Sequence, residues 1–204
     1  MTKGVQVFLA NSPADAARLA PATIISGWDD CPGERIRTYL AAAVRLSQMV
    51  NRRLDRLQAV TNKSAAWNAA GSPEDLWFGD YSDAKLNKVR RTFQGITRHL
   101  SSTRLEVTTR GWKTYYGMAI PLIEKIALGR AWHYPGLGPD DDAERVQTFV
   151  HEASHICGRF SAAEAKAYGR GAAQALTRWR MRATRNADNY GYYALDVLDL
   201  ACTF

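Results

Sequence analysis

The sequence predicts an α+β fold that is mostly helical, with a small mixed or antiparallel sheet. Apolar residues recur at helical spacing in the first half of the chain and again after residue 141. Between these parts, at about residues 103–132, short runs typical of strands are separated by Gly and Pro. Since 46% of the 204 residues are hydrophobic, we expect one domain over residues 1–204, with an irregular lead over about residues 1–30.

Two helices are expected before the sheet, and each begins at a recognisable start signal. Pro32 and Glu34 open a long helix whose apolar face continues to Leu57. Ser82 is expected to cap a second helix, which is basic on its polar face. The strands that follow are predicted over residues 105–109, 115–120 and 123–128.

Two helices are expected after the sheet. The first begins at the acidic residues from Asp141 and stops at Gly158. An apolar stripe that includes Val146, Phe149 and Val150 runs along it. The second covers about residues 190–200 and closes the chain.

The most specific motif is His151-Glu152-Ala153-Ser154-His155, an H-E-x-x-H sequence in the middle of the first of these helices. Two His four residues apart project from one helical face and can both bind Zn²⁺. The Glu between them can act as a general base toward a water molecule at the metal. The alternative is a solvated or core His pair on an amphipathic helix. The pattern predicts a zinc metallopeptidase.

A catalytic zinc needs three protein ligands, so a third residue must join the two His. No His follows His155, and the carboxylates that follow it are Glu164, Asp188, Asp196 and Asp199. We favour Glu164, because its separation from His155 lets the chain turn and return to the metal. Glu164 can instead complete a capping box, in which its side chain bonds the backbone N–H of Ser161.

Three stretches together resemble the aspzincins, the family of deuterolysin and the peptidyl-Lys metalloendopeptidases. The family pattern runs H-E-x-x-H, G-T-x-D-x-x-Y-G and N-A-D-N, and this chain has HEASH at 151–155, SAAEAKAYG at 161–169 and NADNY at 186–190. LWFGDY at 76–81 and KIALGRAW at 125–132 are similar to two further family stretches. The resemblance covers about residues 74–194. It implies a zincin-like fold, a Zn²⁺ cofactor, and cleavage of protein or peptide substrates.

The resemblance also implies site roles, with departures from the family pattern. Glu164 stands where the family has an aspartate ligand, and Tyr168 follows it by four residues instead of three. Tyr168 inherits the role of stabilising the oxyanion, which a phenol fills by donating one hydrogen bond. The alternative for Tyr168 is a tyrosine packed at a helix surface. Residues 125–128 are implied as an open strand edge for an extended peptide.

Asp188 is the candidate substrate-binding residue. It corresponds to one of two carboxylates that hold the substrate ammonium in the lysine-specific members, and Gly191 stands where the second is expected. One carboxylate still favours a cation, but lysine specificity does not carry over. Asn186 or Asp188 can instead cap the last helix, and the two interpretations are compatible.

The formal charge of +7 supports an alternative, a basic module that binds nucleic acid or a partner around a structural or inactive zinc site. Arginines at 178, 180, 182 and 185 surround Trp179, and a second basic set lies within residues 85–98. No Gly-rich phosphate loop, zinc-finger spacing or aromatic RNA-binding strand accompanies them. We therefore expect solvated charges, and do not expect nucleic-acid binding as the main function.

The sequence also suggests where the protein acts. No apolar run is long enough to insert into a membrane, and the first residues do not form a secretory signal peptide. Three Cys are too few for a disulfide framework, so we expect folding in a reducing cytoplasm with each Cys a small buried hydrophobe. We expect export by a non-classical or type VI-like route, as an effector or toxin with a secretion-system carrier or immunity protein as partner.

Overall fold

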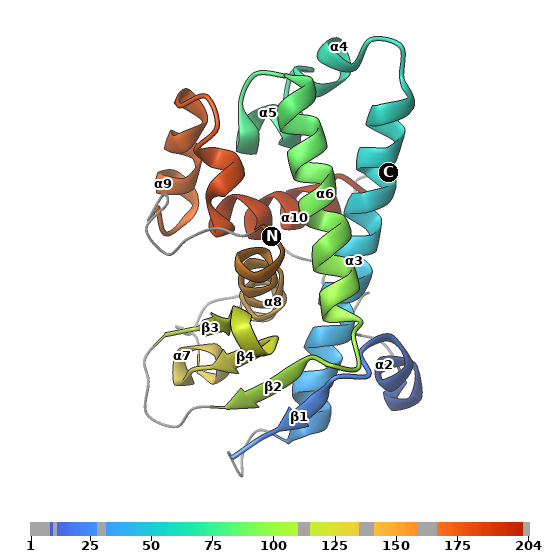
Figure 1. The fold of residues 1–204 in the computed structure, drawn as a ribbon, viewed down its shortest axis with the longest axis vertical. Coiled ribbons are helices and arrows are strands. Elements are labelled where there is room, and N and C mark those ends of the chain that lie inside the picture. Colours follow the sequence, from blue (N-terminus) through green and yellow to red (C-terminus); the bar gives the residue numbers. More distant parts are fainter. Residues whose placement is uncertain are drawn as a thin grey trace.

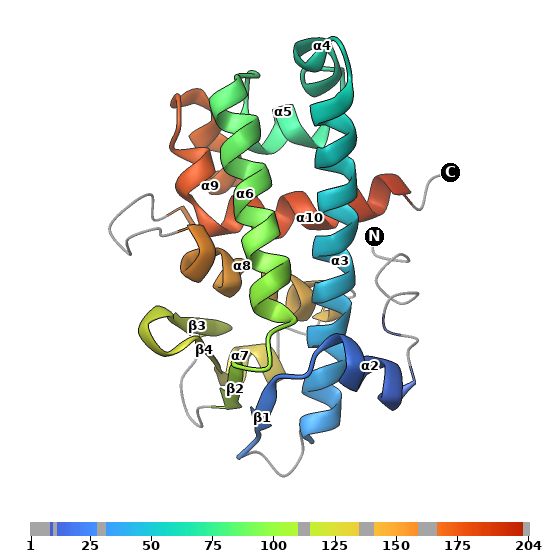
Figure 2. The same cartoon turned by 45° about the vertical axis from the view of Figure 1, so that its right-hand side comes forward.

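The computed structural model describes residue 9 and residues 12–27, 32–109, 115–134, 141–158 and 167–201. Helices α3 (Gly33–Ala59) and α6 (Asp83–Leu100) run side by side, and α10 (Ala187–Ala201) crosses behind them (Figures 1 and 2). Helix α8 (Asp141–Gly158) lies between α10 and a small sheet at one end of the molecule (Figure 1). The predicted α+β, mostly helical fold is confirmed. In the described part of the chain, no helix has the length and apolar character needed to cross a membrane.

The predicted helix starts are confirmed. The first long helix begins directly after Pro32, and α6 begins after Ser82, whose Oγ accepts a hydrogen bond from the backbone N–H of Lys85 at 3.2 Å. Helix α8 covers the predicted range, and α10 begins three residues earlier than predicted, at Ala187. The starts of α3 and α6 and the bounds of α8 depend on local capping and Gly or Pro signals, so sequence alone was sufficient to place them, but not the start of α10.

The prediction of an irregular lead over residues 1–30 is wrong in part. Helix α2 (Pro13–Leu19) begins after Ser12, whose Oγ accepts from the N–H of Asp15 at 3.2 Å, and strand β1 (Thr23–Ile25) follows it. Ser followed by Pro is a helix-start signal that accounts for α2. The strand is three residues long, and its formation depends on pairing with a distant partner, β2 (Glu106–Thr109).

The sheet is mixed, with strand order β1-β2-β4-β3 among the residues the structure describes. Strand β4 (Lys125–Leu128) pairs in parallel with β2 and antiparallel with β3 (Gly117–Ile120). The expectation that residues 125–128 form an open edge is therefore wrong, because β4 has a partner on each side. Among the described strands, β3 is the edge strand that packs against α8.

Aromatic packing fixes α10 against the rest of the core. Phe78 and Phe93 each contact both Tyr190 and Tyr193, with ring centroids 5.1 to 5.5 Å apart. The stretch resembling the family at residues 76–81 thus has a structural role. The short elements that complete the fold are α4 (Lys63–Trp67), α5 (Pro73–Phe78), η1 (Pro121–Ile123), α7 (Arg130–His133), α9 (Arg170–Ala175), η2 (Leu176–Arg178) and η3 (Ala183–Arg185).

Candidate active site

Helix α8 brings His151, Glu152 and His155 together. The Nε2 atoms of the two His lie 3.2 Å apart, and Glu152 Oε1 lies 4.0 Å from His151 Nε2. Within the described residues these three side chains form a group whose ligand atoms all lie within 4.8 Å of one another. The i, i+4 spacing on a helix accounts for this grouping.

The two imidazoles fit a tetrahedral zinc ion. Two nitrogens that each bind zinc at about 2.0–2.1 Å lie about 3.3 Å apart at the tetrahedral angle, close to the 3.2 Å found here. Burial, followed by the charge of His151, lowers the pKa of His155 to about 4. His155 is therefore neutral near pH 7, which is the protonation state that binds a metal.

Asp188 holds His151 from the other side of its ring. Its Oδ1 lies 2.6 Å from His151 Nδ1, and its Oδ2 accepts a hydrogen bond from the backbone N–H of Gly169 at 2.6 Å. Burial lowers the pKa of His151, but the hydrogen bond that His151 Nδ1 donates to Asp188 and the charges of Glu152 and Asp188 outweigh it, so the net shift is upward. The carboxylate is only 5% exposed and both of its oxygens are engaged. A carboxylate on Nδ1 fixes the orientation of the ring, and Nε2 then faces Nε2 of His155.

Glu152 lies against the edge strand of the sheet. Its Oε2 accepts a hydrogen bond from the backbone N–H of Ala119 in β3 at 2.7 Å. Burial raises the pKa of Glu152, opposed by His151 and by the Ala119 N–H. The close approach of β3 depends on Gly117, where an added Cβ would lie 2.9 Å from Glu152 Oε1 and 2.8 Å from Thr148 Cγ2. A buried carboxylate with a raised pKa is suited to accept a proton near neutral pH.

A second glycine allows α10 to approach α8. A Cβ added at Gly191 would overlap the side-chain amide of Gln147, which is one turn before His151 on α8. The buried side chain of Gln147 therefore fills the space into which a side chain at residue 191 would project. This contact lies one turn of α10 beyond Asp188.

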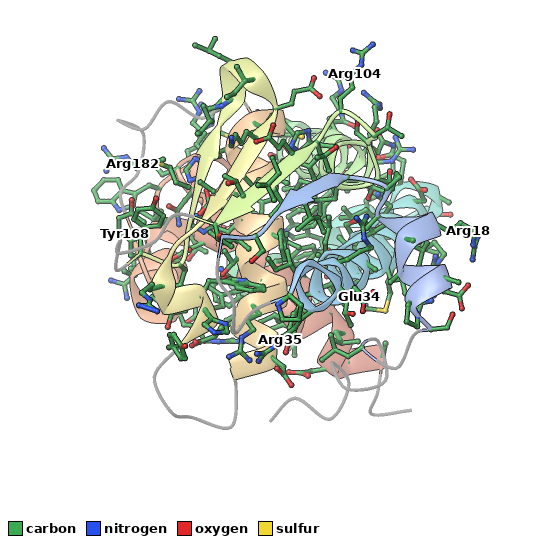
Figure 3. The ribbon with its side chains drawn as sticks, turned by 90° about the horizontal axis from the view of Figure 1, so that it is seen from below. Arg18, Glu34, Arg35, Arg104, Tyr168 and Arg182 are labelled. Carbon is green, nitrogen blue, oxygen red and sulfur yellow. The ribbon has the colours of Figure 1, made fainter. Side chains whose placement is uncertain are left out.

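Two predicted site residues remain, Glu164 and Tyr168, and the structure describes only Tyr168. Glu164 lies outside the described residues. Tyr168 is 73% exposed, and Figure 3 shows it at the outer surface. The backbone on each side of it is bonded to the start of α10, since Asn186 Nδ2 donates to the carbonyl oxygen of Ala167 at 3.1 Å and Gly169 donates to Asp188.

The comparisons with known proteins agree with this geometry. The family profile described as lysine-specific metallo-endopeptidase matches residues 63–195, which is more than half of the chain. The chain belongs to this family. The aspzincin resemblance drawn from the motifs is confirmed. A peptidyl-Lys metalloendopeptidase of Armillaria mellea is 27% identical over 173 residues, which cover 82% of this chain and 45% of the relative.

A solved zinc peptidase from Grifola frondosa is similar to this aspzincin in fold. The TM-score is 0.59 at 25% sequence identity, and the match covers 81% of this chain and 96% of the other. The chain thus spans nearly all of that structure, but less than half the length of the Armillaria relative.

Three features of the site were missed by sequence reasoning. They are Gly117, Ala119 and Gln147, and the sequence patterns alone assign none of them to the site. Only Gly117 had a usable signal, because a glycine within a strand often marks close approach of another backbone or side chain. The contacts of Ala119 and Gln147 depend on how distant segments pack.

Proposed function

We propose that this aspzincin is a zinc-dependent endopeptidase that cleaves peptide bonds in protein substrates. The observation that carries the proposal is the arrangement around His151, in which Nε2 faces Nε2 of His155 while Nδ1 is held by Asp188. His151 and His155 would hold the metal, with Glu164 as the proposed third ligand. This donor set, two imidazoles and one carboxylate, is one that catalytic zinc sites use.

A zinc ion held by these residues would activate a water molecule and polarise the carbonyl of the scissile bond. Glu152 accepts the proton of the attacking water and later delivers it to the leaving amine. Its burial and raised pKa support this role. Tyr168 is the proposed hydrogen-bond donor to the oxyanion, supported by the bonds that tie Ala167 and Gly169 to α10 beside His151.

The substrate is proposed to lie along the outer side of β3. The backbone N–H of Gly129 donates to the carbonyl oxygen of Tyr116, the residue before β3, at 3.0 Å, so this carbonyl group faces the β4 side. Ala119 instead directs its N–H outward, to Glu152. An extended peptide pairing with this edge would bring a carbonyl group beside Glu152 and the two His. When the peptide is bound, its carbonyl oxygen can replace Glu152 as the acceptor for Ala119.

Strict lysine selectivity is not part of the proposal. Both oxygens of Asp188 are engaged by His151 and Gly169, and the amide of Gln147 fills the space beside Gly191. The subsite next to these residues is therefore proposed to be polar and uncharged. Digestion of a denatured protein mixture, with the cleavage sites read by mass spectrometry, should show no dominant Lys, and Gln147→Glu should increase cleavage beside Lys and Arg. Dominant cleavage at Lys by the wild type would contradict this.

The proposed activity has a direct test. Purified protein should contain about one zinc per chain and cleave a denatured protein, and a chelator should abolish cleavage. Glu152→Gln should retain zinc and lose activity, whereas His155→Ala should lose both. Full activity in Glu152→Gln, or wild-type zinc content in His155→Ala, would exclude the proposed site.

An effector or toxin role is a separate proposal, supported by the damage that a peptidase with broad protein substrates does inside a cell. Expression of the wild type in the cytoplasm of a bacterium or a eukaryotic cell should arrest growth. The matched Glu152→Gln variant, expressed at the same level, should not. Equal growth of both strains in every host would contradict the role.

A further inference from the structure

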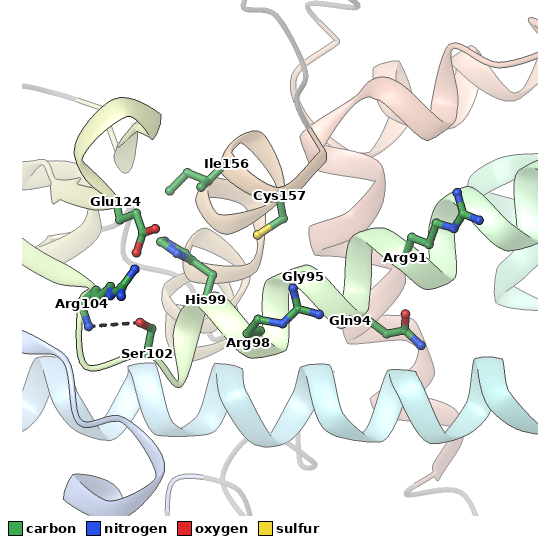
Figure 4. A pocket seen from close by; sticks show the side chains of 10 residues that line it. All are labelled: Arg91, Gln94, Gly95, Arg98, His99, Ser102, Arg104, Glu124, Ile156 and Cys157. Atoms are coloured by element: carbon green, nitrogen blue, oxygen red, sulfur yellow. Dashed lines mark hydrogen bonds between the residues drawn. The ribbon is translucent and has the colours of Figure 1, made fainter.

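A cavity of about 590 Å³ lies where α6 crosses the last turn of α8 (Figure 4). It is separate from the candidate active site. Cys157 lines the cavity and lies two residues beyond His155, and successive helical residues are rotated by about 100°, so the two side chains leave α8 in roughly opposite directions. The two helices come close here because residue 95 is a glycine, where an added Cβ would lie 2.8 Å from Cys157 Cβ.

Positive charge dominates the cavity. Arg91 and Arg98 extend from α6, Arg104 follows on the turn before β2, and the carboxylate of Glu124 faces them as a single negative charge (Figure 4). Within the described part of the chain, none of the three arginines forms an ion pair. Unpaired guanidinium groups gathered around one cavity indicate an anionic ligand, because each presents a fork of donors that matches phosphate or carboxylate oxygens.

A buried polar atom also points into this cavity. His99 is only 7% exposed, and its Nε2 has no hydrogen-bond partner in the described structure. Figure 4 shows its ring directed toward Glu124 across the cavity. Buried polar groups in folded proteins nearly always have a partner, so an unpaired ring nitrogen that lines a cavity indicates a ligand that supplies one.

The spacing of the charges selects the kind of anion. Arg91 and Arg98 are separated by seven residues of helix, which is about 10 Å along the axis. A ligand with an anionic group at each end matches this spacing and can engage both guanidinium groups at once. Glu124 suits a ligand that also carries hydroxyl groups, because a carboxylate accepts their hydrogen bonds but repels a continuous phosphate backbone. The volume lies within the range of small-molecule sites, about 300–1,000 Å³.

We propose that this cavity binds a small ligand that carries two phosphate groups and hydroxyl groups, such as a sugar bisphosphate. Arg98 and Arg104 hold one phosphate and Arg91 holds the other. His99 contacts the ligand from the floor of the cavity, and Glu124 accepts from a hydroxyl. The proposal is independent of the peptidase activity, since it uses none of the residues assigned to the zinc site.

The test is calorimetric titration of the whole chain with fructose 1,6-bisphosphate at constant ionic strength. We expect saturable binding of one ligand per chain, and at least tenfold weaker binding of fructose 6-phosphate. Arg98→Gln and Arg104→Gln should each reduce the affinity at least tenfold, because each removes a charged hydrogen-bond donor. Arg180→Gln, which removes the same charge from an exposed position outside the cavity, should change it less than twofold.

Two further variants complete the design. His99→Leu should fold with an unchanged or higher Tm, because it removes an unpaired buried polar group, and should bind at least fivefold more weakly. Glu152→Gln should bind like the wild type. Equal losses in Arg98→Gln and Arg180→Gln would show non-specific charge attraction and overturn the proposal. Tighter binding of a short oligonucleotide or of phosphatidylglycerol vesicles than of the bisphosphate would also overturn it.

Discussion

Oδ1 of Asp188 lies 2.6 Å from Nδ1 of His151, so a carboxylate on α10 sets the orientation of a proposed metal ligand on α8. The other oxygen of Asp188 accepts from Gly169, which is joined directly to Tyr168. One buried carboxylate therefore links α8, α10 and the backbone beside the proposed oxyanion donor. A hydrogen-bonded carboxylate of this kind fixes the tautomer of a ligating His and increases its basicity.

Asp188→Asn tests this relationship. The substitution keeps the size of the side chain but removes its charge, so we expect zinc affinity to fall about 10- to 100-fold with the fold retained. Competition with a chelator measures the affinity, and Asp55→Asn, at an exposed position far from the site, is the control. Wild-type zinc affinity combined with an altered side-chain preference would instead make Asp188 a substrate-binding residue.

Gly117→Ala tests the contact between β3 and Glu152. The added methyl would lie 2.9 Å from Glu152 Oε1, so β3 or the carboxylate must shift. We expect activity to fall at least tenfold with zinc content unchanged, because displacement of about 1 Å in a catalytic group is costly. Gly171→Ala is the matched control, since no described atom beyond its chain neighbours and the backbone of its own helix lies within 4 Å of the Cβ added there. Equal activity of the two variants would show that β3 does not position Glu152.

The parts of the fold that sequence could predict are those set by local signals. The H-E-x-x-H helix has an acidic start, an apolar stripe and a glycine at its end, and its two His meet because of helical periodicity alone. The start of α6 depends on one side chain, Ser82. Such features need only a few neighbouring residues.

The rest depends on contacts between distant segments. The local sequence around Asp188 is compatible with three roles, which are holding His151, capping α10 and binding substrate. The packing of α10 on α8 decides between these roles. The sequence also could not show which strand lies at the edge of the sheet, because strand order depends on how all the strands pair and not on the residues of any one strand. The cavity at Arg98 and Arg104 requires a helix crossing at Gly95 that the basic pattern does not indicate.

Acid should destabilise the protein through Glu74. This fully buried carboxylate accepts hydrogen bonds from Arg53 at 2.6 and 2.8 Å, from Ser72 at 2.7 Å and from Tyr193 at 2.7 Å. Burial raises the pKa of Glu74, but the bonds and charge of Arg53 outweigh it and the net shift is downward. A pKa lower in the folded than in the unfolded state means that this stabilisation is present above about pH 4.3 and is lost as pH falls further.

Urea unfolding of Glu74→Ala at pH 7 and pH 3.5 measures this effect. Loss of one partner of a buried ion pair costs about 3–5 kcal/mol, so the variant should be much less stable at pH 7 and closer to the wild type at pH 3.5. Asp55→Ala breaks the exposed pair with Arg90 and should cost about 1 kcal/mol or less. Similar losses in both variants at pH 7 would contradict the assigned role of Glu74.

The third zinc ligand is decided by Glu164→Gln. If Glu164 binds zinc, the Gln variant should lose both metal affinity and activity, because an amide oxygen is a much poorer zinc ligand than a carboxylate. If Glu164 only completes a capping box with Ser161, Gln preserves the bond and the variant should behave as wild type. Asp188 is not an equivalent substitute, since its oxygens bond His151 Nδ1 and Gly169 on the side away from Nε2. A silent Glu164→Gln would therefore direct attention to Glu152, and zinc loss in Glu152→Gln would then identify Glu152 as a ligand instead of the base.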